Sequence, residues 1–291
     1  MTPEGKVAVI TDSGSSIRPG SPEAEEFGVT IVPLEVKLWE NGMYVPYSDA
    51  EISSVDFYQR MRSSERLPQT SGSVLGRLTE AYQKLSTRAQ SIISIHITSK
   101  HSVAWQTAVL AKDLIQEKAP ETGPIEVIDS KQVSLATWFP AQLAAELSIK
   151  GVALQQIKEE VLEAIAKTQL YVTLQTFDNL IKGGRADEIV KAVFATMLSI
   201  YPVLGLADGK LKDFAKARTA QKARGQMIQM VGDAGKLVRL AVVHTNAIAV
   251  AEKVKGALGK IYQGNIPIYE AGPALAVHAG EGAIGIAFQK A

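Results

Sequence analysis

Residues 7–14 read Val-Ala-Val-Ile-Thr-Asp-Ser-Gly, a short apolar run that ends in a polar turn. Four apolar residues in a row favour a strand that is buried on both faces, and the Asp-Ser-Gly that follows is typical of a turn. The same pattern recurs at residues 92–97 and 125–128. Strands buried on both faces are characteristic of a parallel sheet covered by helices, so this stretch predicts an α/β fold.

Segments with helical periodicity separate these strands. One predicted helix has a shared apolar face made of Val74, Leu78, Ala81, Tyr82 and Leu85. A second has a face made of Val103, Thr107, Leu110, Ala111 and Leu114. Residues 31–38 form a further strand candidate, with Pro33 near its start or on a sheet edge. Strands that alternate with helices predict βαβ units and a largely parallel sheet.

The pattern changes after residue 153. A striped helix over 154–165 precedes a strand at 170–174 and a helix that stops at Gly183-Gly184. Residues 201–206 and 210–214 flank Ala-Asp-Gly and predict a β-hairpin, and further strands are predicted at 237–243, 266–269 and 283–288. A hairpin among helices predicts a mixed α+β second domain. For 291 residues we therefore expect two domains, 1–152 and 153–291, with the boundary near Gly151.

The composition excludes several classes of protein. Hydrophobic residues make up 46% and charged residues 21%, as in ordinary soluble globular proteins. A net charge of +1 argues against nucleic-acid binding, and the absence of cysteine removes disulfides and thiolate chemistry. The apolar run at residues 7–10 is too short for a signal peptide, and no stretch approaches the length of a membrane span. We expect a soluble, cytoplasmic protein.

Common catalytic motifs are missing from the sequence. It contains neither the G-x-S-x-G of a nucleophile elbow nor the H-E-x-x-H of a zinc helix. Residues 205–210 come nearest to a phosphate-binding loop, but the spacing is one residue short and no Ser or Thr follows Lys210. The four histidines lack metal-ligand spacing. We therefore predict no metal and no resident cofactor.

Two clusters of polar residues stand before predicted helices. Residues 70–73 read Thr-Ser-Gly-Ser, and residues 98–102 read Thr-Ser-Lys-His-Ser. Ligands of α/β proteins bind outside the carboxyl ends of the strands, where the amides at helix N-termini favour anions. Hydroxyls and amides without a basic clamp suit a single carboxylate. Ser and Thr before a helix are also the ordinary N-cap residues, and that interpretation stays open.

Short motifs distributed over nearly the whole chain resemble the DegV family of bacterial fatty-acid-binding proteins. In the first half these are Ile10-Thr11-Asp12-Ser13, Pro68-Gln69-Thr70-Ser71, the segment 97–102 with Gln106 and Ala108, and Ile128-Asp129-Ser130. In the second half they are residues 180–185 (Leu-Ile-Lys-Gly-Gly-Arg), 202–204, 208–210, 217–219 and the segment 272–285 with His278. Each motif is short, but all occur in the order of the family.

The resemblance implies two α/β domains with a long-chain fatty acid, such as palmitate, bound between them or in the first. In similar proteins the carboxylate is held by a Thr, a Ser of the next loop and a histidine near the C-terminus. Carried onto this chain, these residues are Thr70 (with Ser71 beside it), Ser102 or Ser99, and His278. The alternative interpretation of His278 is an ordinary core histidine with a satisfied hydrogen bond.

Some members of the family are the acyl-carrying subunit of fatty acid kinase, in which a separate protein supplies ATP. The resemblance makes Arg185 and Arg218, otherwise solvated loop residues, candidates for contact with that kinase. The sequence departs from the family pattern at Val103, where a glycine is usual, and a lost glycine restricts the loop that holds Ser102. Tyr201 stands where a lysine is common, which changes the expected partner contacts.

Two rival functions stay open beside a non-catalytic carrier. A serine-dependent hydrolase or acyltransferase would pair a loop serine with His278, but no acidic residue that orients the histidine is identifiable. A regulatory module without lipid is the other rival. Burying the roughly 14 methylenes of a sixteen-carbon chain would contribute on the order of 11 kcal/mol before ordering costs. An unpaired buried charge is prohibitive, so the carboxylate needs partners. Two hydroxyls and helix-terminal amides, with or without a protonated imidazole, would supply charge-assisted hydrogen bonds.

Overall fold

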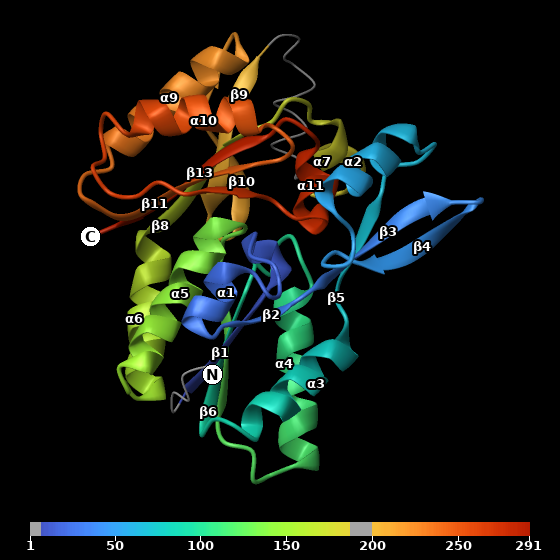
Figure 1. Ribbon diagram of the computed structural model, residues 1–291, viewed down its shortest axis with the longest axis vertical. Coiled ribbons are helices and arrows are strands. Elements are labelled where there is room, and N and C mark those ends of the chain that lie inside the picture. The colour runs from blue at the N-terminus through green and yellow to red at the C-terminus, as the bar shows by residue number, and fades with distance from the viewer. Residues whose placement is uncertain (1–6, 187–199) are drawn as a thin grey trace.

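The computed structural model describes residues 7–186 and 200–291 of the chain. The first half contains an all-parallel sheet in the order β2-β1-β6-β7, in agreement with the prediction. Its strands are β1 (Val7–Asp12), β2 (Thr30–Val32), β6 (Ser91–His96) and β7 (Ile125–Asp129). The elements around it are the short 3-10 helix η1 (Ser13–Ser15) and the helices α1 (Pro22–Phe27), α3 (Leu75–Ser86), α4 (Ala104–Lys118) and α5 (Leu135–Ile149) (Figure 1).

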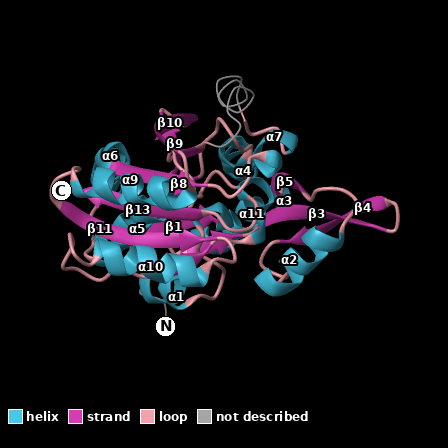
Figure 2. Cartoon of the chain, turned by 90° about the horizontal axis from the view of Figure 1, so that it is seen from above, coloured by secondary structure: helices cyan, strands magenta, loops and turns pink. Residues whose placement is uncertain are grey.

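A small antiparallel sheet in the order β4-β3-β5 was not predicted. It is formed by β3 (Leu34–Glu40), β4 (Met43–Ser48) and β5 (Gln69–Ser73), with α2 (Ser54–Ser63) before β5. The single strand predicted for residues 31–38 is wrong: Pro33, which lacks an N–H and has a fixed φ, separates β2 from β3. The β3–β4 hairpin projects from the body of the molecule in both views (Figures 1 and 2).

The second half contains a mixed sheet in the order β10-β9-β8-β13-β11-β12, which confirms the predicted mixed character. Within this sheet, β11 and β12 are the one parallel pair among the described strands, and the other pairs are antiparallel. The strands are β8 (Thr168–Thr173), β9 (Tyr201–Ala207), β10 (Lys210–Ala217), β11 (Leu237–His244), β12 (Ile268–Glu270) and β13 (Ile284–Lys290). The helices are α6 (Leu154–Lys167), α7 (Asp178–Lys182), α9 (Ala220–Gly232), α10 (Ile248–Leu258) and α11 (Pro273–Ala279). The predicted hairpin is β9–β10.

The buried face of α4 differs from the prediction by about one residue. Val103 and Leu110 are 53% and 49% exposed, whereas the buried side chains are Ala104, Ala108, Ala111 and Ile115. Two apolar stripes lie side by side on this helix, and the alanines allow α4 to pack closely against α3 in a shared cluster with Leu78. The apolar stripe predicted for α6 is buried at Ile157, Val161 and Ile165 as expected.

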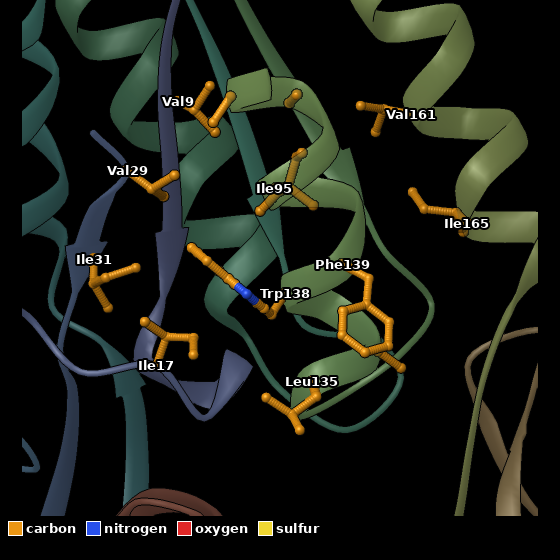
Figure 3. Packing of buried hydrophobic residues seen from close by; sticks show 14 of the residues in the cluster. Val9, Ile17, Val29, Ile31, Ile95, Leu135, Trp138, Phe139, Val161 and Ile165 are labelled. Carbon is orange, nitrogen blue, oxygen red and sulfur yellow. The ribbon is translucent and has the colours of Figure 1, made fainter. Parts of the chain in front are cut away.

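Helix α5 lies in the largest hydrophobic cluster and connects the two halves of the chain. Figure 3 shows Trp138 lying toward Ile17 and Ile31, and Phe139 lying toward Ile165. The same cluster contains Ala287 of β13, so the parallel and the mixed sheets share one core around α5. The proposed boundary near Gly151 stays a prediction. No helix within residues 7–186 and 200–291 is long and apolar enough to cross a membrane.

Candidate functional site

A cavity of about 290 Å³ lies between the mixed sheet, α11, β5 and the loop that follows β6. One wall is the face of the mixed sheet that carries Leu204, Leu206, Leu170, Val172, Gly285 and Val243. These residues come from β9, β8, β13 and β11, which are neighbours in the sheet. With strands about 4.8 Å apart, this wall is roughly 14 Å wide. Ala274 and Leu275 of α11 also line the cavity. Its shape and aliphatic lining suit an alkyl chain.

Several polar residues of the cavity wall lie close together, and we call this part of the cavity its polar end. Thr70 and Ser71 come from β5, Ser102 from the loop 97–103 and His278 from α11, and all of them line the cavity. Thr70 Oγ1 lies 2.9 Å from His278 Nε2, although the two residues are 208 positions apart in the chain. The fold thus brings the predicted threonine and histidine into direct contact and places Ser102 on the same cavity.

The surroundings of His278 favour its neutral imidazole. Burial, the nearby Arg185 charge and His101 together lower the pKa of His278 from 6.5 to about 3. Its Nδ1 has no hydrogen-bond partner among the described residues. Gly183 leaves room for the ring, because a Cβ at that position would lie 2.6 Å from Nδ1. These surroundings disfavour the protonated imidazole considered from the sequence, and the role of His278 at the site stays a prediction.

The serine candidates separate into two groups. The Ser102 hydroxyl accepts a hydrogen bond from the Ala104 N–H (3.1 Å), which leaves its own proton to donate. Ser99 lies outside the described lining of the cavity, and its N–H donates to Asp129 (3.2 Å). The Ser71 hydroxyl donates to the Glu35 carboxylate, so its proton is already used. Of the candidate serines, Ser102 is the one on the cavity wall with a hydroxyl proton not committed to another described residue.

Neither polar cluster supplies the N-cap residue of the helix that follows, although the Ser102 hydroxyl accepts from the N–H of the first residue of α4. Residues 70–73 lie in β5, and the N-cap residues of α3 and α4 are Val74 and Val103, which make no side-chain capping bond. Val103 has φ −85° and ψ 2°, a conformation that valine can adopt, so the missing glycine does not strain the loop of Ser102. The valine side chain instead packs on Gly72, where a Cβ would lie 2.6 Å from Val103 Cγ2.

Arg185 lies on the cavity wall, which the sequence did not predict. Its Nε donates to the His101 carbonyl (2.7 Å) and its Nη1 to the Gly183 carbonyl (3.0 Å). Gly184, with φ of 69°, turns the chain back after α7 and directs Arg185 to this position. Arg185 is the one lysine or arginine among the described residues that line the cavity. Arg218, by contrast, is exposed between β10 and α9.

The loop 97–103 is fastened to the second half of the chain beside this polar end. The Thr98 hydroxyl donates to the Gly209 carbonyl (3.0 Å), and the Leu211 N–H donates to His101 Nε2 (3.3 Å). Gly209 closes the β9–β10 hairpin with φ of 79°, and a Cβ there would lie 2.5 Å from Thr98 Oγ1. Both halves of the chain therefore build the polar end of the cavity.

The other hydroxyls on the cavity wall already have partners. Ser134 Oγ lies 2.8 Å from Ser16 Oγ, and the Thr245 hydroxyl donates to the Gly280 carbonyl (2.6 Å). Among the described residues no group of histidine and carboxylate side chains has the arrangement of a metal site. The polar end at Thr70 and His278 is therefore the part of the cavity that best suits a polar ligand group.

A Ser–His–Asp array is present, but away from the cavity. Ser94 Oγ lies 2.6 Å from His96 Nε2, and His96 Nδ1 lies 2.9 Å from the Asp12 carboxylate. All three residues are 0% exposed and lie outside the described lining of the cavity. A substrate therefore has no path to Ser94. The hydrolase hypothesis named a loop serine and His278, and no described carboxylate orients that histidine.

Comparison with known proteins identifies relatives over the whole length of the chain. A DegV domain-containing protein of Listeria monocytogenes is 30% identical over 282 residues, which cover 96% of each chain. The crystal structure of DegV from Bacillus subtilis, described as a fatty acid binding protein, superposes with a TM-score of 0.86 at 27% identity, covering 99% of this chain and 100% of that one. A DegV family protein of Eubacterium eligens, loaded with heptadecanoic acid, gives a TM-score of 0.83 at 21% identity, covering 98% and 100%.

The model of the DegV family, whose members are described as uncharacterised proteins, matches residues 6–291. This match agrees with the motif order in the sequence and with the two α/β halves around one cavity. The chain belongs to the DegV family.

Proposed function

We propose that this protein binds one long-chain fatty acid in the cavity and acts as a non-catalytic carrier. The observation that carries the proposal is the contact between Thr70 and His278 at the polar end of a mainly aliphatic cavity. The Bacillus subtilis DegV protein, which has the same fold, is described as a fatty acid binding protein. An alkyl chain would fill the aliphatic part, and its carboxylate would lie at the polar end.

In this proposal the hydroxyls of Thr70 and Ser102 donate hydrogen bonds to the carboxylate. The neutral imidazole of His278 carries its proton on Nε2 and donates it to Thr70 Oγ1, which leaves the Thr70 proton for the ligand. Arg185 supplies the positive charge that a buried carboxylate needs. Ser102 is preferred to Ser99 because it lies on the cavity wall. Ser71 is the neighbour of Thr70 in β5, and it supports the site through its hydroxyl, which donates to the Glu35 carboxylate.

The two ends of the ligand contribute differently to binding. Each buried methylene contributes about 0.8 kcal/mol, so chain burial supplies most of the affinity. The polar end fixes the orientation, and its carboxylate lies near the loop 97–103 and the β9–β10 hairpin. We propose that a separate ATP-dependent kinase meets the carboxylate there. Arg218 is exposed and directly follows β10, and this position supports a role for the residue in docking the kinase. The absence of cysteine supports a cytoplasmic location.

Replacing Thr70 by alanine removes one hydrogen bond to the anion. We expect a loss of about 1.5–3 kcal/mol, which corresponds to roughly ten- to hundredfold weaker palmitate binding. Ser102→Ala is expected to have a similar effect, whereas Ser99→Ala is the matched control and should bind like the wild type. Titration calorimetry on delipidated protein measures the three dissociation constants. Wild-type affinity in both Thr70→Ala and Ser102→Ala would exclude this placement of the carboxylate.

A further inference from the structure

A chain of hydrogen bonds runs through the core toward the polar end of the cavity. The Tyr82 hydroxyl donates to Ser94 Oγ (2.8 Å), Ser94 Oγ lies 2.6 Å from His96 Nε2, and His96 Nδ1 lies 2.9 Å from Asp12 Oδ2. All four side chains are 0% exposed. The chain connects α3 and β6 to the end of β1, and the carrier function proposed above does not use it directly.

Every donor in this chain points toward Asp12. Because Ser94 already accepts the Tyr82 proton, its own proton is available for His96 Nε2. The His96 proton then resides on Nδ1 and is donated to the Asp12 carboxylate. The geometry resembles a catalytic triad, but Ser94 has no access to a substrate. This series of hydrogen bonds instead holds the Asp12 carboxylate in one orientation.

Asp12 in turn holds the beginning of two segments near the cavity. Its Oδ1 accepts from the Gly14 N–H (3.0 Å) and its Oδ2 from the Ile97 N–H (3.1 Å). Ile97 is the first residue of the loop 97–103 and, like Ser102, it lines the cavity. The packing around Gly14 is tight, since a Cβ at this position would lie 2.7 Å from Asp12 Oδ1 and 2.9 Å from Ile97 Cδ1.

We infer that Asp12 is a positioning residue for the carboxylate site, acting through Ile97 on the loop that carries Ser102. This inference rests on the proposed fatty-acid binding. Asp12 makes no contact with the ligand. Asp12 Oδ2 accepts hydrogen bonds from both His96 Nδ1 and the Ile97 N–H. In an asparagine, an NH2 group in the place of Oδ2 would face these two donors, and an NH2 group in the place of Oδ1 would lose the Gly14 bond. The loop would then start from a different position, and the Ser102 hydroxyl would no longer meet the carboxylate in the best geometry.

Asp12→Asn is expected to weaken palmitate binding on the order of tenfold, and most of this loss should disappear when Ser102 is already alanine. The measurement is a double-mutant cycle from calorimetric dissociation constants of wild type, Asp12→Asn, Ser102→Ala and the double variant. The matched control is Asp49→Asn, because Asp49 is also buried but bonds to Ser13 rather than to the loop. Asp49→Asn should bind palmitate like the wild type.

The outcomes separate this inference from the proposed function. Equal losses for Asp12→Asn in the wild-type and Ser102→Ala backgrounds would show a general structural effect and overturn the inference. An unchanged affinity in Asp12→Asn would overturn it too, while leaving fatty-acid binding intact. If wild-type protein fails to bind palmitate, the proposed function itself is wrong. If Asp12→Asn does not fold, Ser94→Ala, which removes the partner of His96 Nε2, should show the same non-additivity with Ser102→Ala at a smaller amplitude.

Discussion

Arg185→Ala is expected to weaken palmitate binding by roughly thirty- to a thousandfold, the largest loss of any polar substitution in the cavity. Arg185 is the one lysine or arginine on the described cavity wall, and its guanidinium lowers the pKa of His278 through their proximity. Removing one partner of a partly buried charge pair costs about 2–4 kcal/mol, because the carboxylate is left without a compensating charge. The Arg185 side chain also holds the His101 carbonyl, so the loop beside Ser102 loses a fastening point.

The matched control is Arg218→Ala, which removes the same charge from an exposed position outside the described cavity lining. This variant should bind palmitate with wild-type affinity. It should instead show slower acyl-phosphate formation with a kinase partner, and the difference from wild type should shrink at high salt. If Arg185→Ala retains wild-type palmitate affinity, Arg185 is not a carboxylate partner. If Arg218→Ala loses lipid, Arg218 belongs to the binding site and the cavity extends further than described.

Val172→Phe is expected to reduce palmitate affinity by about a hundredfold, because the ring would occupy the middle of the cavity. Val172 lies on β8 between Leu204 of β9 and Gly285 of β13, and Gly285 has no side chain to resist the ring. Displacing the equivalent of about four methylenes from the cavity corresponds to roughly 3 kcal/mol. The melting temperature of the delipidated variant should change little, since the ring fills space that a ligand would otherwise take.

Val238→Phe provides the control for this substitution. Val238 is also on a strand of the mixed sheet but is 48% exposed and outside the described cavity lining. We expect wild-type palmitate affinity in this variant. The test is a series of saturated fatty acids of increasing length: Val172→Phe should lose the long chains more than the short ones. An equal loss at every length would mean that the alkyl chain does not pass Val172.

The fold class was predictable from the sequence because it depends on local patterns. The apolar run at residues 7–10, the α6 stripe and the Ala-Asp-Gly hairpin each specify their own structure, and all three are present. The small antiparallel sheet was not predictable, because β5 consists of Gln-Thr-Ser-Gly-Ser. Nothing in that sequence resembles a strand; it pairs with β3 because the tertiary fold places them together.

The candidate site was predictable in part, and the residues show why. The resemblance to the family placed Thr70 and His278 together, and the structure has them in contact. Arg185 was assigned to the surface, because the sequence alone does not show that Gly184 turns the chain toward the cavity. The Asp12–His96 contact joins β1 to β6 across 84 positions, so no local pattern reveals it. Contacts of this kind depend on the sheet order.

The central claim, that the cavity holds a fatty acid, has one most direct test. The recombinant protein would be purified without detergent, denatured and extracted with organic solvent, and the extract analysed by mass spectrometry. The cavity predicts about one long-chain fatty acid per protein chain in the wild type and far less in Val172→Phe. Recovery of a nucleotide or a sugar with no lipid, or equal lipid in both proteins, would contradict the account.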